Sequence, residues 1–270
     1  ADENEHAFNS RQLRQRDSHV PVLLREVVVG LAPTPDATVI DATLGNGGHF
    51  SAILEKLKSK GTILGIDVDE IAVANVRKNI QPHIAKALFA TGNFRDIAKI
   101  AREQGITKSD AIVADLGWRT EQFSGDKEAG SGKGFSFTAD EPLQMTFGNP
   151  ASYSFTATNI VNSWREADIE TILKNYGEER YARKIARAIV ARREKKSIGT
   201  ASELAEIIES AVPAKYRHGR IHPATKTFQA LRIAVNDELD ALQEFIASAV
   251  ALLSPRGRLA VISFHSIEDR

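Results

Sequence analysis

The feature that most constrains the fold is a glycine-rich turn behind a short β-branched run. Residues 38–49 read TVIDATLGNGGH, so the run ends in Asp41 and three glycines follow within seven residues. Glycine adopts the positive φ angles of tight turns and lets the backbone approach a ligand closely. Apolar residues then recur at helical spacing over residues 50–57. We therefore expect a strand, a ligand-binding turn and a helix, in that order.

The same alternation continues along the chain. Further strands are expected at 61–67, 87–90, 111–115 and 258–264, and a helix with one apolar face follows the run at 61–67. Strands that alternate with helices at this spacing form parallel βαβ units with right-handed crossovers. The predicted fold class is α/β, a doubly wound, Rossmann-like sheet.

The alternation stops after Asp115 and resumes near the end of the chain. Residues 118–155 are rich in glycine, serine and aromatic side chains, and helical periodicity then predicts helices at 166–176, 178–193, 202–211 and 224–253. We interpret residues 1–18 as a flexible tail, 19–119 and 221–270 as the sheet domain, and 120–220 as a mostly helical, substrate-recognising insert. A doubly wound sheet of this kind often carries two more strands at one edge, and we expect this chain to lack them.

Composition excludes several classes of protein. There is no cysteine, which removes disulfides and thiolate metal sites, and the seven histidines form no zinc-binding pattern, so no metal is expected. No apolar run approaches the roughly 20 residues of a membrane span. The polar N-terminus lacks the apolar stretch of a signal peptide. We expect a cytoplasmic protein, or one of an organelle matrix if a transit peptide has been removed.

The glycine turn distinguishes between two cofactors. A dinucleotide fingerprint requires glycine at position 50, where this chain has Phe50. The spacing DxxxGxGG that starts at Asp41 is typical of turns that bind S-adenosylmethionine (SAM), although a purely structural turn is an alternative. Asp67 ends the second strand, where a carboxylate can accept hydrogen bonds from ribose hydroxyls. Phe94 follows the third strand and Asp115 ends the fourth, at the edge where such sheets bind ligands.

Long segments of the chain resemble the RsmH (MraW) family, the SAM-dependent methyltransferases that act on cytosine N4 of ribosomal RNA. The resemblance runs from residue 19 to residue 270 and is strongest in DATLGNGGH, GIDVDE, GEERYARKIARAI, RIHPATKTFQALRIAVNDEL and GRLAVISFHSIEDR. It implies SAM as the cofactor, RNA of the small ribosomal subunit as the partner, and a homodimer formed through the insert. It also implies a set of cofactor contacts at Gly47, Gly48, His49, Asp67, Phe94, Asp115 and Gln122.

Two segments depart from the family pattern. Where the family continues DLG with a small Val-Ser-Ser-Pro type of segment, this chain has Trp118-Arg-Thr-Glu121. Residues 134–148 read GFSFTADEPLQMTFG, which lacks a charged pair that the family has near its presumed substrate pocket. These departures concern the catalytic loop and the substrate, and a SAM-binding ribosome-assembly factor with little or no catalysis is therefore the alternative function.

Methylation of cytosine N4 suggests roles for three residues. The amine is a poor nucleophile because its lone pair is delocalised into the ring, so an acceptor that orients it should contribute most. Asp115 is the first candidate for this acceptor. Ser263 and His265, which follow the last strand, are secondary candidates, and His265 could take the proton or fix a loop.

Basic residues cluster in the insert although the formal net charge of the chain is zero. Residues 176–196 contain eight Lys or Arg and three Glu, and residues 214–226 contain four Lys or Arg and no acidic residue. Such patches can hold RNA phosphates around an unstacked base, whereas a solvated helix face explains part of the charge equally well. A small-molecule methyltransferase is a third possibility that this basic insert disfavours.

Overall fold

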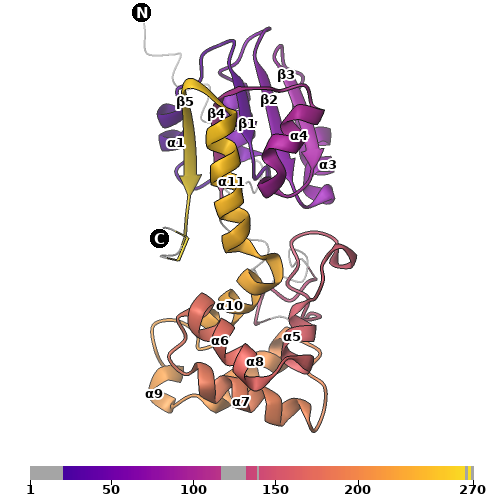
Figure 1. Cartoon of the computed structure of the whole chain (residues 1–270), viewed down its shortest axis with the longest axis vertical. Helices are drawn as coiled ribbons and strands as arrows, with labels where there is room; N and C mark the ends of the chain where they lie inside the picture. The colour runs from indigo at the N-terminus through magenta and orange to yellow at the C-terminus, as the bar shows by residue number, and fades with distance from the viewer. Residues whose placement is uncertain (1–20, 117–131, 139, 265–266, 269–270) are drawn as a thin grey trace, which may run out of the picture.

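The computed structural model describes residues 21–116, 132–138, 140–264 and 267–268. In this part of the chain the protein consists of a sheet lobe and a helical lobe stacked along the long axis (Figure 1). The sheet is parallel throughout, with strand order β3-β2-β1-β4-β5. Its strands are β1 (Thr38–Asp41), β2 (Thr62–Asp67), β3 (Lys86–Thr91), β4 (Ser109–Asp115) and β5 (Leu253–Ile262). The predicted α/β class and the doubly wound arrangement are confirmed.

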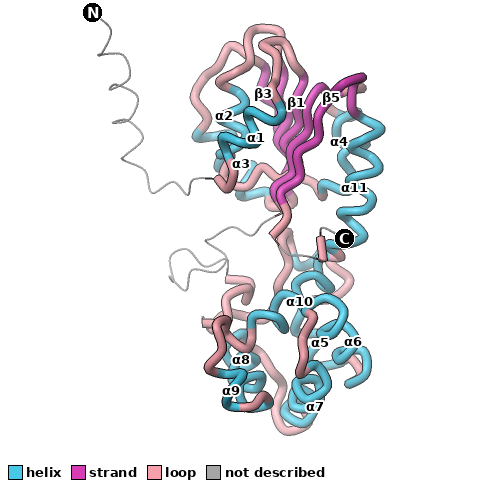
Figure 2. Tube along the Cα trace, turned by 90° about the vertical axis from the view of Figure 1, so that its left-hand side faces the viewer, coloured by secondary structure: helices cyan, strands magenta, loops and turns pink. Residues whose placement is uncertain are grey.

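Helices cover both faces of the sheet, as a parallel sheet requires. One face packs against α1 (Leu24–Leu31), α2 (Gly48–Leu54) and α3 (Glu70–Asn79), and the other against α4 (Ile97–Glu103) and α11 (Glu238–Leu252) (Figure 2). Successive strand residues point to opposite faces: Val39 belongs to the first core and Ile40 to the second. Burial on both sides explains why these strands read as continuous apolar runs rather than as alternating ones.

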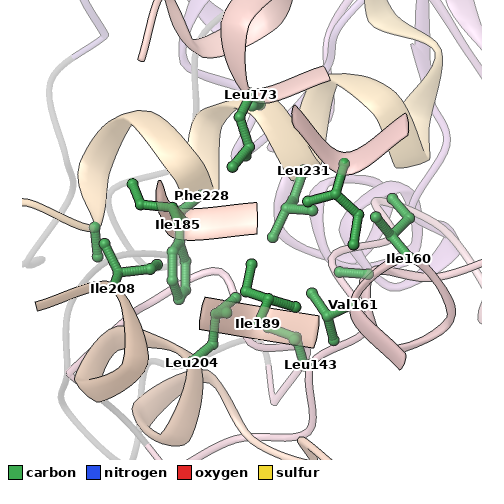
Figure 3. Close-up of a cluster of buried hydrophobic side chains, with 14 of the residues drawn as sticks. Leu143, Ile160, Val161, Leu173, Ile185, Ile189, Leu204, Ile208, Phe228 and Leu231 are labelled. Carbon is green, nitrogen blue, oxygen red and sulfur yellow. The ribbon is translucent and has the colours of Figure 1, made fainter. Parts of the chain in front are cut away.

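The helical lobe has a core of its own. It is built from α5 (Ala157–Ser163), α6 (Glu166–Gly177), α7 (Ala182–Arg193), α8 (Ala201–Ala211), α9 (Ala214–Arg217) and α10 (Thr225–Asn236). Figure 3 shows Ile185 and Ile189 of α7 meeting Leu204 of α8 and Phe228 of α10 in this core. The short helices η2 (Phe94–Asp96) and η4 (Pro150–Ser152) lie outside it.

The prediction of one long helix over residues 224–253 is wrong. The segment forms α10 and α11, which are separated by Asp237 in the left-handed conformation with φ 50°. Contacts from distant segments fix the break: Asn236 Oδ1 accepts a hydrogen bond from the Phe147 amide at 2.9 Å, and Arg95 pairs with Asp237 at 2.8 Å. Buried α10 side chains belong to the helical core, so we propose a domain boundary at Asp237 instead of residue 221.

Two other boundaries differ from those expected. The helix predicted from residue 178 begins at Ala182, because Glu178 adopts a left-handed conformation that ends α6. The last strand was expected at 258–264 but runs from Leu253 to Ile262, with an irregular register opposite Ser109 and Ala111. The expected lack of two further strands in this chain stays a prediction.

Candidate functional site

Three carboxylates gather where the central strands end. Asp41, Asp67 and Asp115 are the last residues of β1, β2 and β4, which are neighbours in the sheet. Asp41 pairs with Gly65 on one side and Val113 on the other, so it lies two residues deeper than Asp67 and Asp115. Figure 1 shows the β5 arrow pointing toward the helical lobe, and all strands are parallel, so this acidic edge faces that lobe.

The glycine turn is held directly against this edge. The Gly45 amide donates a hydrogen bond to Asp67 Oδ2 at 2.8 Å, and the Asp69 amide donates to Asp67 Oδ1 at 2.9 Å. Gly47 has φ +77°, and a Cβ there would lie 2.7 Å from Cγ1 of Val76 on α3. Only glycine fits this position, because a side chain would be strained both by the backbone and by its neighbour.

Gly48 and His49 begin α2 and pack under the segment that precedes α1. A Cβ on Gly48 would lie 2.0 Å from Cγ of Pro21. The His49 ring is buried, with Nε2 3.2 Å from the Val22 carbonyl and Nδ1 3.9 Å from Asp115 Oδ2. Burial lowers the pKa of His49, although Asp115 acts in the opposite direction. A carbonyl only accepts, so Nε2 carries the proton of the neutral ring and Nδ1 faces Asp115 as an acceptor.

Asp115 stands at the centre of the edge and is partly accessible. Its side chain is 24% exposed, and its backbone amide donates to Thr43 Oγ1 at 2.7 Å. This hydroxyl ties the end of β4 to the start of the glycine turn. Sequence reasoning did not single out Thr43, since a threonine after a strand carries no distinguishing signal.

Asp41 is the most buried member of the group. Its Oδ1 accepts a hydrogen bond from the Thr43 amide at 3.2 Å, and Oδ2 is buried without a hydrogen-bond partner among the described residues. Burial, followed by the charges of Asp67 and Asp115, raises the pKa of Asp41 to about 7. The turn motif drew attention to this residue, but its burial could only be seen in the fold.

The remaining predicted site residues differ in how the structure places them. Phe94 begins η2 after β3 and packs edge-to-face on Phe245 of α11, with ring centroids 5.2 Å apart, so part of it belongs to the core. Ser263 is exposed and directly follows Ile262, which pairs with Asp115. Gln122 and His265 lie outside the described residues.

The geometry fits a cationic ligand with hydroxyl groups. The carboxylates of Asp67 and Asp115 create a negative potential at this edge, and the buried Asp41 oxygen would gain a partner from a positive group. The turn lets a ligand approach the backbone closely. The Gly45 amide donates a hydrogen bond to the Asp67 carboxylate, and these two groups form the side of the site next to β2. A nucleoside that carries a cationic chain has both kinds of group.

The helical lobe presents basic residues around two tyrosines. Arg180 and Lys184 each lie 5.7 Å from the ring centroid of Tyr181, which packs edge-to-face on Tyr216 of α9. The buried Glu179 accepts hydrogen bonds from the Tyr216 hydroxyl at 2.9 and 3.1 Å. The start of α7 and α9 therefore form one surface, which we call the tyrosine-basic surface. It comprises Arg180, Tyr181, Lys184, Lys215, Tyr216 and Arg217.

The other end of α7 uses its charges within the lobe. Arg192 and Lys196 approach Glu203 at 3.8 and 2.9 Å, and Arg193 donates to the carbonyls of Val161 and Trp164. The basic cluster of residues 176–196 therefore divides into an outward half and an internally bonded half. The outward half is the better candidate for contacts with phosphates, because the other half already uses its charges within the lobe.

Two negative findings apply to the described residues. None of their helices is both long and apolar enough to cross a membrane. Nor do three or more of their His, Asp or Glu side chains group in a way that could hold a metal ion.

Comparison with known proteins assigns the family. Residues 16–270 match the model of the MraW methylase family. The chain is 44% identical over 253 residues to the ribosomal RNA small subunit methyltransferase H of Heliobacterium modesticaldum, covering 93% of this chain and 79% of that protein. It is 42% identical over 252 residues to the protein of the same name from Brevibacillus brevis, covering 93% and 78%. A third, from Heliobacterium mobile, is 43% identical over 253 residues, covering 93% and 79%. The chain belongs to the MraW methylase family.

Proposed function

We propose that this protein methylates RNA of the small ribosomal subunit, with SAM as the methyl donor and the exocyclic N4 amine of a cytidine as the target. The observation that carries the proposal is the acidic edge of the sheet, where Asp41, Asp67 and Asp115 meet the glycine turn in a chain of the MraW methylase family. The similarity to relatives named as small-subunit methyltransferases supports the RNA target.

The proposed methyl donor suits this edge because SAM carries a sulfonium and an ammonium group as well as ribose hydroxyls. When bound, it supplies an electrophilic methyl group on positively charged sulfur. Asp67 is proposed to accept from the ribose hydroxyls in addition to the Gly45 amide that it already holds. The proposed contact set is Gly47, Gly48, His49, Asp67, Phe94, Asp115 and Gln122.

Asp115 is proposed to orient the target amine. Its carboxylate is partly exposed, and its backbone is fixed by the Thr43 hydroxyl. An acceptor held rigidly at this point would align the nitrogen lone pair and stabilise the positive charge that develops on the amine. The Nδ1 atom of His49 lies 3.9 Å from Asp115 Oδ2 and forms the wall of the site on that side. Ser263, beside the end of β4, and His265 are proposed as secondary contacts to the base.

The tyrosine-basic surface is proposed to hold the RNA around the target base. Its lysines and arginines would neutralise phosphates, and its tyrosines would stack on unpaired bases. RNA must present the cytidine unstacked, because an amine inside a helix cannot reach a strand-end site. The helical lobe therefore has the role of substrate recognition in this proposal, and the sheet lobe that of chemistry.

One experiment separates the proposal from its alternatives. SAM binding is titrated by calorimetry, and transfer of a tritiated methyl group is measured to small-subunit RNA and to a pool of small metabolites. Binding with transfer to RNA supports the proposal. Binding without transfer favours the assembly-factor alternative, and transfer to small molecules alone favours the third. Asp115→Asn should lose most of the transfer even at saturating SAM, and full transfer by this variant would contradict the role given to Asp115.

A further inference from the structure

The buried carboxyl of Asp41 is the starting point of this inference. Asp41 is 2% exposed, and the hydrogen bond from the Thr43 amide reaches only Oδ1. Oδ2 is buried and has no hydrogen-bond partner within the described residues. A charged carboxylate oxygen without a partner is strongly unfavourable in a protein interior, and such a group usually binds a proton instead.

The neighbours of Asp41 reinforce this tendency. Asp67 on β2 and Asp115 on β4 flank it, and both act to raise its pKa, to about 7 together with the larger effect of burial. The amides of Thr43 and Phe50 act in the opposite direction without cancelling these effects. On α2, burial lowers the pKa of His49 in spite of the opposite effect of Asp115, and this favours the neutral ring. Near neutral pH, Asp41 is therefore balanced between its two protonation states.

We propose that Asp41 carries a proton in the ligand-free site and loses it to solvent when the cationic methyl donor binds. This inference rests on the proposed function, because it takes SAM as the ligand. An opposite charge near a carboxyl typically lowers its pKa by 1–3 units. The positive groups of the methyl donor would thus replace the proton as the partner of the buried carboxyl, and binding would be linked to pH.

The size of the effect follows from these shifts. If binding lowers the pKa of Asp41 from about 7 to about 5, about 0.8 proton is released per SAM bound at pH 6, and about 0.1 at pH 8. The same linkage makes the dissociation constant of SAM roughly tenfold larger at pH 6 than at pH 8. No covalent step is involved, since the proton leaves to bulk buffer.

Calorimetry tests the proposal directly. SAM is titrated into the full chain at pH 6 in phosphate and in imidazole buffers, whose different ionisation enthalpies reveal the number of protons released. The wild type should release about 0.8 proton. Asp41→Asn, which mimics the neutral carboxyl, should bind SAM without release, and Asp36→Asn, a change at an exposed carboxyl on the loop before β1, should keep the release. Loss of the release in Asp36→Asn, or its persistence in Asp41→Asn, would overturn the assignment.

A second measurement needs no variant. Infrared difference spectra of the wild type at pH 6 should lose the carbonyl stretch of a protonated carboxyl when SAM is added, and an unchanged band would refute the proposal even if Asp41→Asn fails to fold. Different results would contradict the proposed function and the proposed proton exchange. SAM that binds without proton release contradicts only the proton exchange, whereas SAM that does not bind at all removes the proposed methyl donor and this inference with it.

Discussion

Replacement of Asp41 by asparagine should stabilise the ligand-free protein, and increasingly so as the pH rises. The pKa of Asp41 is about 7 in the fold against 3.8 for an unperturbed aspartate. The folded state therefore binds this proton more tightly than the unfolded state does. Its favourable contribution is complete below pH 3.8 and is lost as the pH rises through 7, because a buried carboxylate must then be tolerated.

The magnitude follows from the two pKa values. Linkage gives a cost in unfolding free energy of about 2 kcal/mol at pH 5, about 3 at pH 6 and about 4 at pH 8, as upper limits. The free energy of unfolding of Asp41→Asn should therefore exceed that of the wild type by a margin that grows by about 2–3 kcal/mol between pH 5 and pH 8.

Urea denaturation at pH 5, 6.5 and 8, followed by circular dichroism without ligand, measures this margin. Asp36→Asn is the matched control, because Asp36 is an exposed carboxyl on the loop before β1. The free energy of unfolding of Asp36→Asn should stay close to that of the wild type at all three pH values. A margin for Asp41→Asn that is constant or shrinks with rising pH would refute the reasoning.

Three further predictions follow from the described contacts. Gly47→Ala should lose about 2–4 kcal/mol of unfolding free energy and most SAM affinity, from left-handed strain and overlap with α3, whereas Gly30→Ala, with open space around it, should not. Asn236→Ala should cost about 2–4 kcal/mol in urea denaturation, because it leaves two backbone groups of the loop before η4 without their partner. Arg180→Ala should reduce the slope of log RNA affinity against log salt by roughly 1, and Arg192→Ala, which loses an internal ion pair, should leave it unchanged.

The sheet and its acidic edge were predictable because their determinants are local. Apolar runs that end in Asp41, Asp67 and Asp115 identify three strands, and the alternation of strands with helices predicts that they are parallel, which places their carboxyl ends at one edge. The glycine turn was predictable as well, because the spacing of its glycines indicates a tight turn with positive φ angles. Gly47 has such a φ.

The details that escaped prediction depend on contacts between distant segments. The break at Asp237 involves neither glycine nor proline, and it is fixed by Arg95, which is 142 residues away in sequence. Helical periodicity continues across the break and gives no sign of it. The orientation of Phe94 against Phe245, and the depth of Asp41 relative to its neighbours, depend in the same way on packing and on strand register.

The most direct test of the account is the identity of the methylated nucleoside. Small-subunit RNA lacking the modification is incubated with the protein and isotope-labelled SAM, digested to nucleosides and analysed by mass spectrometry. The account predicts label on the N4 amine of a cytidine, and its loss with Asp115→Asn. Label on another base or on the cytosine ring carbon, or SAM binding with no label in RNA, would contradict it.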